Sequence, residues 1–336
     1  AEGQRTKPSS SGTIHFVAQL HPEASDDNPG SVDEPFKTIS RAAREVQPGD
    51  TVLIEDGVYR EAVQIEASGT QEAPIVFSAA LGARVVVTGT DVVTGWKKEE
   101  GEANIYSVPW THVFLGWTKD RTHPADDYHL MIGRVEQVFV KGYSLLQVPS
   151  RSELTRGTFF VDENGKQLCV WDRTNVDITE RKPRIEASVR PVIWDCTGSF
   201  VITRGIRFCR APSAAQSGSV MLRGNGDVIE NCIIEEMNGA GVSFKGDRMV
   251  ARGCVIRNNG QMGFGARVED FQMTQCVVEN NNTKNYDRGW EAGGCKLALC
   301  RNAVIENCIF RENRGNGIWF DIGNEACTVR NCLIAH

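Results

Sequence analysis

Short alternations of apolar and polar residues, interrupted by Gly and Asn, repeat through the second half of the chain. The aligned segments are VIENCIIEEMNGAGVSFKG, VARGCVIRNNGQMGFGARV, QMTQCVVENNN, VIENCIFRENRGNGIWFDIG and TVRNCLIAH. Their shared cysteines are Cys232, Cys254, Cys276, Cys308 and Cys332, at steps of 22, 22, 32 and 24 residues. A repeat of this length, made of short alternating segments without helical spacing, predicts the coils of a parallel β-helix.

Stacked coils of such a fold lie about 4.8 Å apart, so each position touches its copy in the next coil. The aligned cysteines, with Gly205 in the same column upstream, are therefore expected to form an interior ladder. Asn259, Asn281 and Asn313 follow five residues after a cysteine and are expected to join their amides along the stack. The cysteine column contains no CxxC and no His, so no metal site is predicted there.

The N-terminal third predicts a cap for the stack. Phe36, Ile39, Ala42, Ala43 and Val46 share one face of an amphipathic helix over roughly 36–46. A Pro-Gly turn and strands follow, and the first coils are expected at 69–90. A helix in this place would cover the open end of the solenoid. We therefore predict that residues 1–90 form the cap and first coils.

Residues 91–190 break the period. Alternating apolar residues around an Asn-Gly pair at 164–165 predict antiparallel hairpins, and so an inserted β-rich subdomain. Two roles stay open for it, as a wall of a substrate cleft or as a shield for the solenoid. The main coils are expected at 191–336, with an incomplete C-terminal end that a further chain or segment completes.

One strand of each coil presents a distinctive outer face. The strands read SVMLRG, GVSFKG, GFGARV, GGCKL and GIWFD. Inward positions are assigned to Val220, Leu222, Val242, Phe244, Phe264, Ala266, Ile318 and Phe320. One outward column is Arg223, Lys245, Arg267, Lys296 and Asp321, where Lys296 requires one residue of slack. The second outward column is Met221, Ser243, Gly265, Gly294 and Trp319.

This outer face has two interpretations. Exposed Lys and Arg are common on any sheet, so the basic column is either solvated surface or a groove for an anionic or polyhydroxylated polymer. In a groove, Trp319 would offer an apolar ring to the C–H face of a sugar.

A longer coil marks the place where a ligand is expected. The coil between Cys276 and Cys308 carries additional residues, including Asp287, Arg288, Trp290 and Glu291. Insertions into solenoid coils usually build the binding face. We expect this loop to rise beside Lys296 and Asp321.

The stretches WEAGGCK and GIWFDIGNEA resemble secreted bacterial right-handed β-helix proteins of the pectate-lyase-like superfamily. The GIWFD element is also similar to that of β-helix glycoside hydrolases such as the β-xylosidase group. The resemblance implies an all-β right-handed parallel β-helix, secreted or periplasmic after signal removal, with Asp321 as nucleophile. The acid/base glutamate of that group would fall beyond His336, and Glu291 is the alternative partner.

A glycoside hydrolase acting on a polysaccharide or oligosaccharide is the resulting prediction. Retaining glycosidases hold two carboxyls about 5–5.5 Å apart, which adjacent rungs nearly supply. Lys296 would hold Asp321 ionised. The predicted catalytic residues are Asp321, Glu291 and Lys296, and the predicted substrate-binding residues are Trp319, Arg267, Lys245, Trp290, Asp287 and Arg288. This prediction includes no metal or cofactor.

Two other functions stay open. In a polysaccharide lyase, Lys296 would be the base, Arg267 would bind a uronate carboxylate, and the Glu291–Lys296 spacing resembles a calcium-ligand and base pair. The arginine that such lyases carry on the following coil is replaced here by Asp321. A non-catalytic carbohydrate-binding solenoid would keep Trp319 and tolerate Asp321→Asn.

The net charge and the absence of long apolar runs bear on whether the chain binds nucleic acid or crosses a membrane. A formal net charge of −6 over 336 residues gives no indication of nucleic acid binding. No run of eighteen apolar residues exists, so no membrane span is expected.

Overall fold

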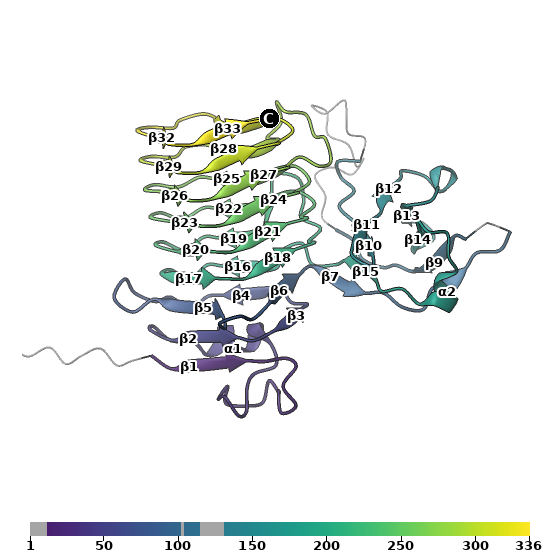
Figure 1. Ribbon diagram of the computed structural model, residues 1–336, viewed down its shortest axis with the longest axis horizontal. Coiled ribbons are helices and arrows are strands. Elements are labelled where there is room, and N and C mark those ends of the chain that lie inside the picture. The colour runs from purple at the N-terminus through teal and green to yellow at the C-terminus, as the bar shows by residue number, and fades with distance from the viewer. Residues whose placement is uncertain (1–11, 102–103, 115–130) are drawn as a thin grey trace, which may run out of the picture.

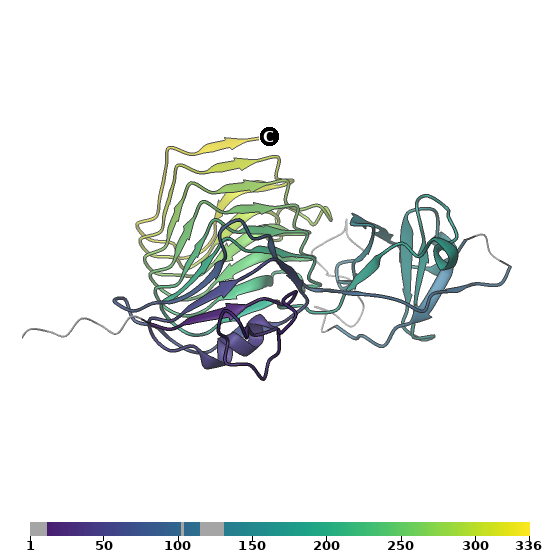
Figure 2. The same ribbon diagram turned by 60° about the horizontal axis from the view of Figure 1, so that its bottom comes forward.

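The computed structural model describes residues 12–101, 104–114 and 131–336. These residues form a right-handed parallel β-helix with a group of largely antiparallel strands beside it (Figures 1 and 2). The predicted fold class is confirmed.

Successive coils contribute strands to parallel sheets that we call the first, second and third walls. The first wall contains, in spatial order, β1 (Ile14–Val17), β2 (Thr51–Ile54), β5 (Ile75–Ala79), β17 (Val201–Arg204), β20 (Val228–Glu230), β23 (Val250–Arg252), β26 (Gln272–Thr274), β29 (Val304–Glu306) and β32 (Thr328–Arg330). The second wall contains β3 (Gly57–Tyr59), β6 (Val85–Thr88), β18 (Arg207–Cys209), β21 (Ile233–Glu235), β24 (Val255–Arg257), β27 (Val277–Glu279), β30 (Ile309–Arg311) and β33 (Leu333–Ala335). The third wall contains β4 (Val63–Ile65), β16 (Trp194–Cys196), β19 (Gly218–Leu222), β22 (Ala240–Phe244), β25 (Met262–Ala266), β28 (Gly293–Leu297) and β31 (Asn316–Phe320).

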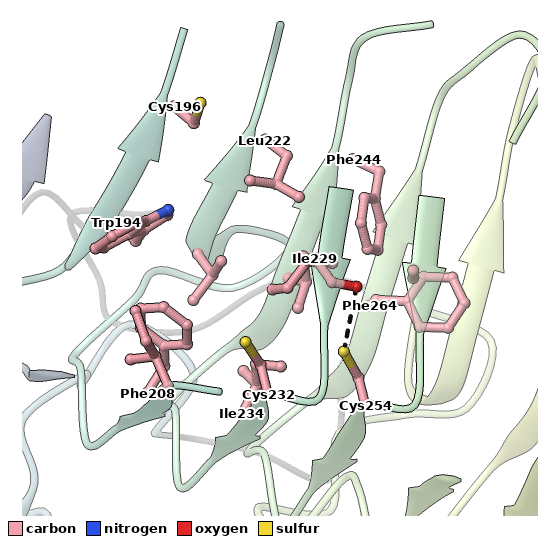
Figure 3. Packing of buried hydrophobic residues seen from close by; sticks show 14 of the residues in the cluster. Trp194, Cys196, Phe208, Leu222, Ile229, Cys232, Ile234, Phe244, Cys254 and Phe264 are labelled. Carbon is pink, nitrogen blue, oxygen red and sulfur yellow. Dashed lines mark hydrogen bonds between the residues drawn. The ribbon is translucent and has the colours of Figure 1, made fainter. Parts of the chain in front are cut away.

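Inward side chains of the three walls fill one continuous core. Trp194, Phe208, Phe244 and Phe264 are among its largest buried side chains, and Figure 3 shows them pointing into the space between the walls. Phe244 and Phe264, on neighbouring coils, meet edge-on, with ring centroids 5.7 Å apart. Each coil therefore buries its apolar face against its two neighbours, which is how a solenoid is stabilised.

The predicted cysteine ladder is present. Cys254 and Cys276 are buried, and the Cys254 amide donates to the Cys276 sulfur at 3.4 Å. The placement of Gly205 in this column is wrong. Arg207 pairs with Ile233, so Ile206, not Gly205, lies in register with Cys232. Gly205 sits one residue earlier in a left-handed conformation (φ 72°), which glycine adopts readily.

The predicted asparagine column is also present. Asn259 Nδ2 donates to Asn281 Oδ1 at 2.9 Å, and Asn281 Nδ2 donates to Asn313 Oδ1 at 3.0 Å. Both Asn259 and Asn281 are fully buried, so the ladder satisfies amides that would otherwise be costly inside the protein.

The predicted capping helix is α1 (Ile39–Glu45). Thr38 caps its N-terminus by accepting a hydrogen bond from the Arg41 amide at 3.1 Å. Ile39, Ala42 and Ala43 face the core, and α1 contacts β1, β2 and β4 at the N-terminal end of the stack (Figure 2).

The period breaks where an inserted subdomain leaves the solenoid. One sheet contains β7 (Thr90–Val92), β15 (Ile185–Ser188), β10 (Val138–Val140) and β11 (Tyr143–Ser144), all antiparallel. The other contains β8 (Lys97–Lys98), β9 (Tyr106–Pro109), β14 (Gln167–Trp171), β13 (Thr158–Asp162) and β12 (Leu146–Gln147), accompanied by η1 (Arg151–Glu153) and α2 (Ile178–Arg181). The hairpin predicted around Asn164 is the β13–β14 pair.

The solenoid continues across this insertion without a gap. β5 pairs directly with β17, β6 with β18 and β4 with β16. The inserted strands have an apolar cluster of their own, which includes Tyr106, Phe159 and Leu168. The subdomain is thus a side branch of a continuous stack.

At the C-terminal end, β31, β32 and β33 form the last coil. Its inward side chains are partly open, and Ile334, which continues the buried column of Phe310, is 55% exposed. Among the residues described, no helix is long and apolar enough to cross a membrane.

Candidate active site

The outer face of the third wall gathers the residues that the sequence singles out. β25, β28 and β31 are neighbours, with Phe264 opposite Cys295 and Cys295 opposite Ile318. Cys295 and Leu297 are buried, so Lys296 between them points outward.

This register corrects the predicted columns. Lys296 lies opposite Gly265 and Trp319, and not in the column of Arg267 and Asp321. The place between Arg267 and Asp321 is taken by Ala298. Gly294 lies two residues before the predicted column, whose place on this rung is taken by Lys296. A Cβ on Gly294 would lie 2.2 Å from the Gly317 carbonyl oxygen, so this glycine permits close stacking of coils.

Lys296 links two carboxylates that are thirty residues apart in the chain. Its Nζ lies 2.8 Å from Oδ2 of Asp321 and forms a second ion pair with Oε1 of Glu291. It also lies over the indole ring of Trp319, 5.1 Å from the ring centroid. We call Glu291, Lys296, Trp319 and Asp321 the third-wall cluster.

Two oxygens bound to one ammonium lie at most about 6 Å apart, because each hydrogen bond spans roughly 2.7–3.2 Å. The side chains of Lys296, Glu291 and Asp321 are 15%, 21% and 28% exposed. The cluster is therefore reachable from solvent and yet sheltered enough for its charges to interact strongly.

Burial alone would lower the pKa of Lys296. The hydrogen bonds and charges of Asp321 and Glu291 outweigh it and raise the pKa above its ordinary value. Lys296 is therefore an ammonium at neutral pH, a group that favours ionised neighbours and that cannot accept a proton.

Glu291 reaches the cluster because the insertion loop, residues 282–292, is held at several points. Gln261, a fully buried residue, donates from Nε2 to the Trp290 carbonyl at 3.0 Å. Asn282 accepts from the Tyr286 amide at 2.7 Å and donates to the Tyr286 carbonyl at 2.9 Å. Glu291 itself has a left-handed backbone (φ 56°), which turns the chain into β28.

Asp321 is held by the backbone at the end of β31. Its amide donates to the Leu297 carbonyl at 2.8 Å, and its carbonyl accepts from Asn324 Nδ2 at 2.9 Å. The backbone of Asp321 is thus fixed on the rung that follows Lys296.

The other predicted substrate-binding residues lie outside the third-wall cluster. Lys245 and Arg267 are exposed on earlier rungs and form no ion pair with any described residue. Asp287 turns back on its own loop and accepts from the Gly289 amide at 2.6 Å, and Arg288 is exposed. Trp290 stacks on Tyr286, with ring centroids 5.8 Å apart, and packs the loop.

Calcium, the ion implied by the lyase interpretation, does not fit the described donors. Calcium takes six to eight oxygen ligands. The cluster offers two carboxylates already joined by an ammonium, and within the described residues no three His, Cys, Asp or Glu side chains gather as a metal site.

Sequence reasoning missed residues that support this wall. Asp195 lies opposite Met221, and its Oδ2 accepts from Arg223 at 2.8 Å, so Arg223 is neutralised. Gln261 could not be found from the sequence. It anchors the insertion loop through one hydrogen bond, and a single such contact produces no repeat in the sequence. Asp195 could have been found, since it sits between the apolar residues Trp194 and Cys196.

Two family models match separate parts of the chain. The right-handed β-helix region matches residues 214–336, and chondroitinase B matches residues 34–95. The second match covers the cap and first coils and includes no residue of the third-wall cluster.

Curated relatives share short segments. An uncharacterised protein YwoF of Bacillus subtilis is 33% identical over 88 residues, 26% of this chain and 19% of that protein. Pectate lyase PEL9 of Emericella nidulans is 34% identical over 75 residues, 22% of this chain and 18% of the relative. The matched segments thus span less than a fifth of either relative.

Similarity to solved structures extends over nearly the whole chain. XylC, solved with xylose, superposes with a TM-score of 0.78 at 17% identity, covering 96% of this chain and 64% of XylC. A glycoside hydrolase superposes with a TM-score of 0.66 at 14% identity, covering 92% of this chain and 79% of that one. The chain is a right-handed β-helix protein, and the resemblance to carbohydrate-active proteins of this fold is confirmed.

Proposed function

We propose that this protein is a retaining glycoside hydrolase, with Asp321 as nucleophile and Glu291 as acid/base. The observation that carries the proposal is the shared contact of both carboxylates with Lys296 on the outer face of the third wall. Their oxygens lie within about 6 Å of each other, which suits the separation of about 5–5.5 Å in retaining enzymes and is shorter than inverting enzymes use.

The chemistry proceeds in two displacements. Asp321 attacks the anomeric carbon, the bond to the leaving oxygen breaks, and Glu291 gives that oxygen a proton. Glu291 then takes a proton from water, which attacks the same carbon and releases Asp321. Substrate entering the cluster displaces the Lys296 ammonium from Glu291. The nearby carboxylate of Asp321 then favours the protonated form of Glu291.

The first substrates to test are aryl and oligomeric xylosides. XylC, which shares the fold, was solved with xylose. Trp319 supports a pyranose substrate, because it is half-buried and adjoins Asp321 on the same strand end. By analogy with extracellular β-helix proteins of this kind, we propose a secreted or periplasmic location.

The test compares Asp321→Gly with Glu291→Ala on p-nitrophenyl xyloside and on xylo-oligosaccharides. Asp321→Gly should lose both activities by about 10³-fold or more, because it lacks the nucleophile. Glu291→Ala should release a first equivalent of nitrophenol from the aryl glycoside at nearly the parental rate, because this leaving group needs no proton. Its later turnover should be slow, because the second step has lost its base, and cleavage of the oligosaccharide should be lost. Added azide should give the retained glycosyl azide with Glu291→Ala and the inverted azide with Asp321→Gly.

Full turnover in folded Asp321→Gly would overturn the proposal. Release of products that absorb in the ultraviolet as unsaturated uronides would favour the lyase alternative, in which Lys296 is the base. The raised pKa of Lys296 argues against that role, since a base must lose its proton near the working pH.

A further inference from the structure

A cavity away from the third-wall cluster lies where the inserted subdomain faces the solenoid. Its volume is about 640 Å³, a size typical of small-molecule sites. The subdomain contributes Glu136, Leu146 and Gln147, and the solenoid contributes Glu236 and Lys284. Glu291, Lys296 and Asp321 do not line it.

The subdomain side carries a polar pair. Glu136 is only 3% exposed, and its Oε2 accepts from Gln147 Nε2 at 3.0 Å. This contact fixes the amide so that Gln147 Oε1 is left as an acceptor. That oxygen is buried and accepts no hydrogen bond from the described residues. A buried acceptor without a donor is costly, so a ligand hydroxyl that reaches this oxygen would gain a hydrogen bond.

The solenoid side supplies a donor from the insertion loop. Lys284 donates from Nζ to Oδ1 of Asn238. Burial lowers the pKa of Lys284 to about 8, although the Glu136 carboxylate acts to raise it. Glu236, on the same side, is paired with Arg210 at 2.7 Å. The charges of the cavity are thus largely balanced, which favours an uncharged ligand over an anion.

The remaining surface is apolar. Met131, Phe139, Leu145, Leu146 and Phe159 line the cavity from the subdomain. An uncharged ligand with hydroxyls on its edges and C–H groups on its faces meets both kinds of surface. A short neutral saccharide has this chemistry, and a cavity of this volume accommodates it.

We propose that the cavity between the inserted subdomain and the insertion loop is a second saccharide site, which binds a neutral mono- or disaccharide without cleaving it. This goes beyond the proposed hydrolase function and does not depend on it. The site gives the inserted subdomain a binding role of its own, in place of the wall or shield expected from sequence.

The test is isothermal titration of the full chain carrying Asp321→Asn, with xylobiose, cellobiose and digalacturonate as probes. A neutral disaccharide should bind with a stoichiometry above one site per chain, or at one site that cavity variants remove. Leu146→Trp, which fills the cavity from an exposed strand position, and Gln147→Ala should each weaken this binding at least tenfold. Gln167→Ala, an exposed residue of the same sheet, is the matched control and should change nothing.

Binding that survives both cavity variants but is lost in Trp319→Ala would overturn the inference, because the saccharide would then lie at the third-wall cluster. Absence of binding by both neutral disaccharides, or binding of digalacturonate alone, would overturn it as well. Loss of hydrolysis in the catalytic variants leaves this result unchanged, so the two proposals fail separately.

Discussion

Lys296 is the residue on which the electrostatics of the third-wall cluster depend, because it contacts both carboxylates and the face of Trp319. Without its charge, Glu291 and Asp321 would face each other directly. Two close carboxylates repel each other, and the Lys296 ammonium between them offsets that repulsion.

Lys296→Met should therefore move the acidic limb of the pH–activity profile to higher pH and lower kcat/KM by about 10²–10³-fold. The measurement is a pH profile of xyloside hydrolysis, with thermal unfolding to show that the variant is folded. Lys98→Met, a variant of an exposed lysine in β8 of the inserted subdomain, is the control. An unshifted acidic limb would mean that Lys296 does not set the ionisation of the pair.

Asp227 offers a second test at the residue scale. It is fully buried, and although the Val201 amide donates to its Oδ1 at 3.0 Å, burial raises its pKa to about 7. The folded state therefore binds this proton more tightly than the unfolded chain. The contribution of Asp227 to stability should fall as pH rises from about 4 to about 7 and then stay level.

Asp227→Asn should stabilise the protein at pH 8, by an amount on the order of a few kcal/mol, and leave stability near pH 4 almost unchanged. Urea unfolding at both pH values measures this. The exposed Asp33→Asn variant should shift neither value. Equal unfolding free energies of Asp227→Asn and the parent at pH 8 would contradict the prediction.

Among the elements, the third wall shows what sequence can and cannot supply. Alternation correctly assigns the inward residues of β19, β22 and β25, since these strands repeat at a constant spacing. It also places Lys296 correctly on the outer face, but in the wrong column, because the insertion loop removes the count that sets the register. The apolar residues Cys295 and Leu297 fix the face of Lys296 and not its partners on the neighbouring rungs. The contact with Glu291 could not be read from sequence, because it depends on the path of the loop.

A single substitution in the asparagine ladder should lower the free energy of unfolding strongly. Asn281 Oδ1 accepts from the Asn259 amide at 3.1 Å and from its Nδ2 at 2.9 Å, and Asn281 Nδ2 donates to the Ile256 carbonyl at 3.1 Å. Asn281→Ala leaves these groups unpaired in the core and should lower the unfolding free energy by roughly 2–4 kcal/mol.

Chemical denaturation measures this, with Asn164→Ala at the exposed β13–β14 turn as the control, expected to stay within about 0.5 kcal/mol. A change of similar size in both variants would mean that the amide stack contributes nothing beyond an ordinary turn.

For the whole molecule, the fold follows from sequence more completely than the site does. Each coil of a solenoid packs on its neighbours in the same way, so the five aligned cysteines are enough to reveal the repeat. The cap was predictable from the apolar face of α1. The position of the subdomain against the insertion loop was not, because the cavity between them depends on residues such as Gln147 and Lys284 that belong to no repeat.

Ion pairs between neighbouring coils, on the outer faces of the first and second walls, also hold the stack together. Glu230 binds Arg204 at 2.5 Å and also Arg252, so one carboxylate joins three coils. Glu235 does the same with Arg207 and Arg257, at 2.5 and 2.7 Å. Networks of this kind contribute more than isolated surface pairs.

The molecule should be equally stable with and without reductant. All eleven cysteines are free thiols, and nine of them are buried. Addition of dithiothreitol should therefore leave the first thermal unfolding midpoint unchanged. A midpoint that falls by several degrees under reductant would show that a disulfide contributes to stability.

The cysteine ladder has a consequence for recovery from heat. Neighbouring coils hold thiols at nearly the spacing that a disulfide requires, and only the tight interior keeps oxidants away. Once the chain opens in air, those sulfurs can join in wrong combinations faster than the coils rewind. Unfolding and refolding curves from repeated heating and cooling should differ in an aerated buffer and coincide in an anaerobic one. In air the protein would then withstand heating up to its first unfolding and fail to refold after it.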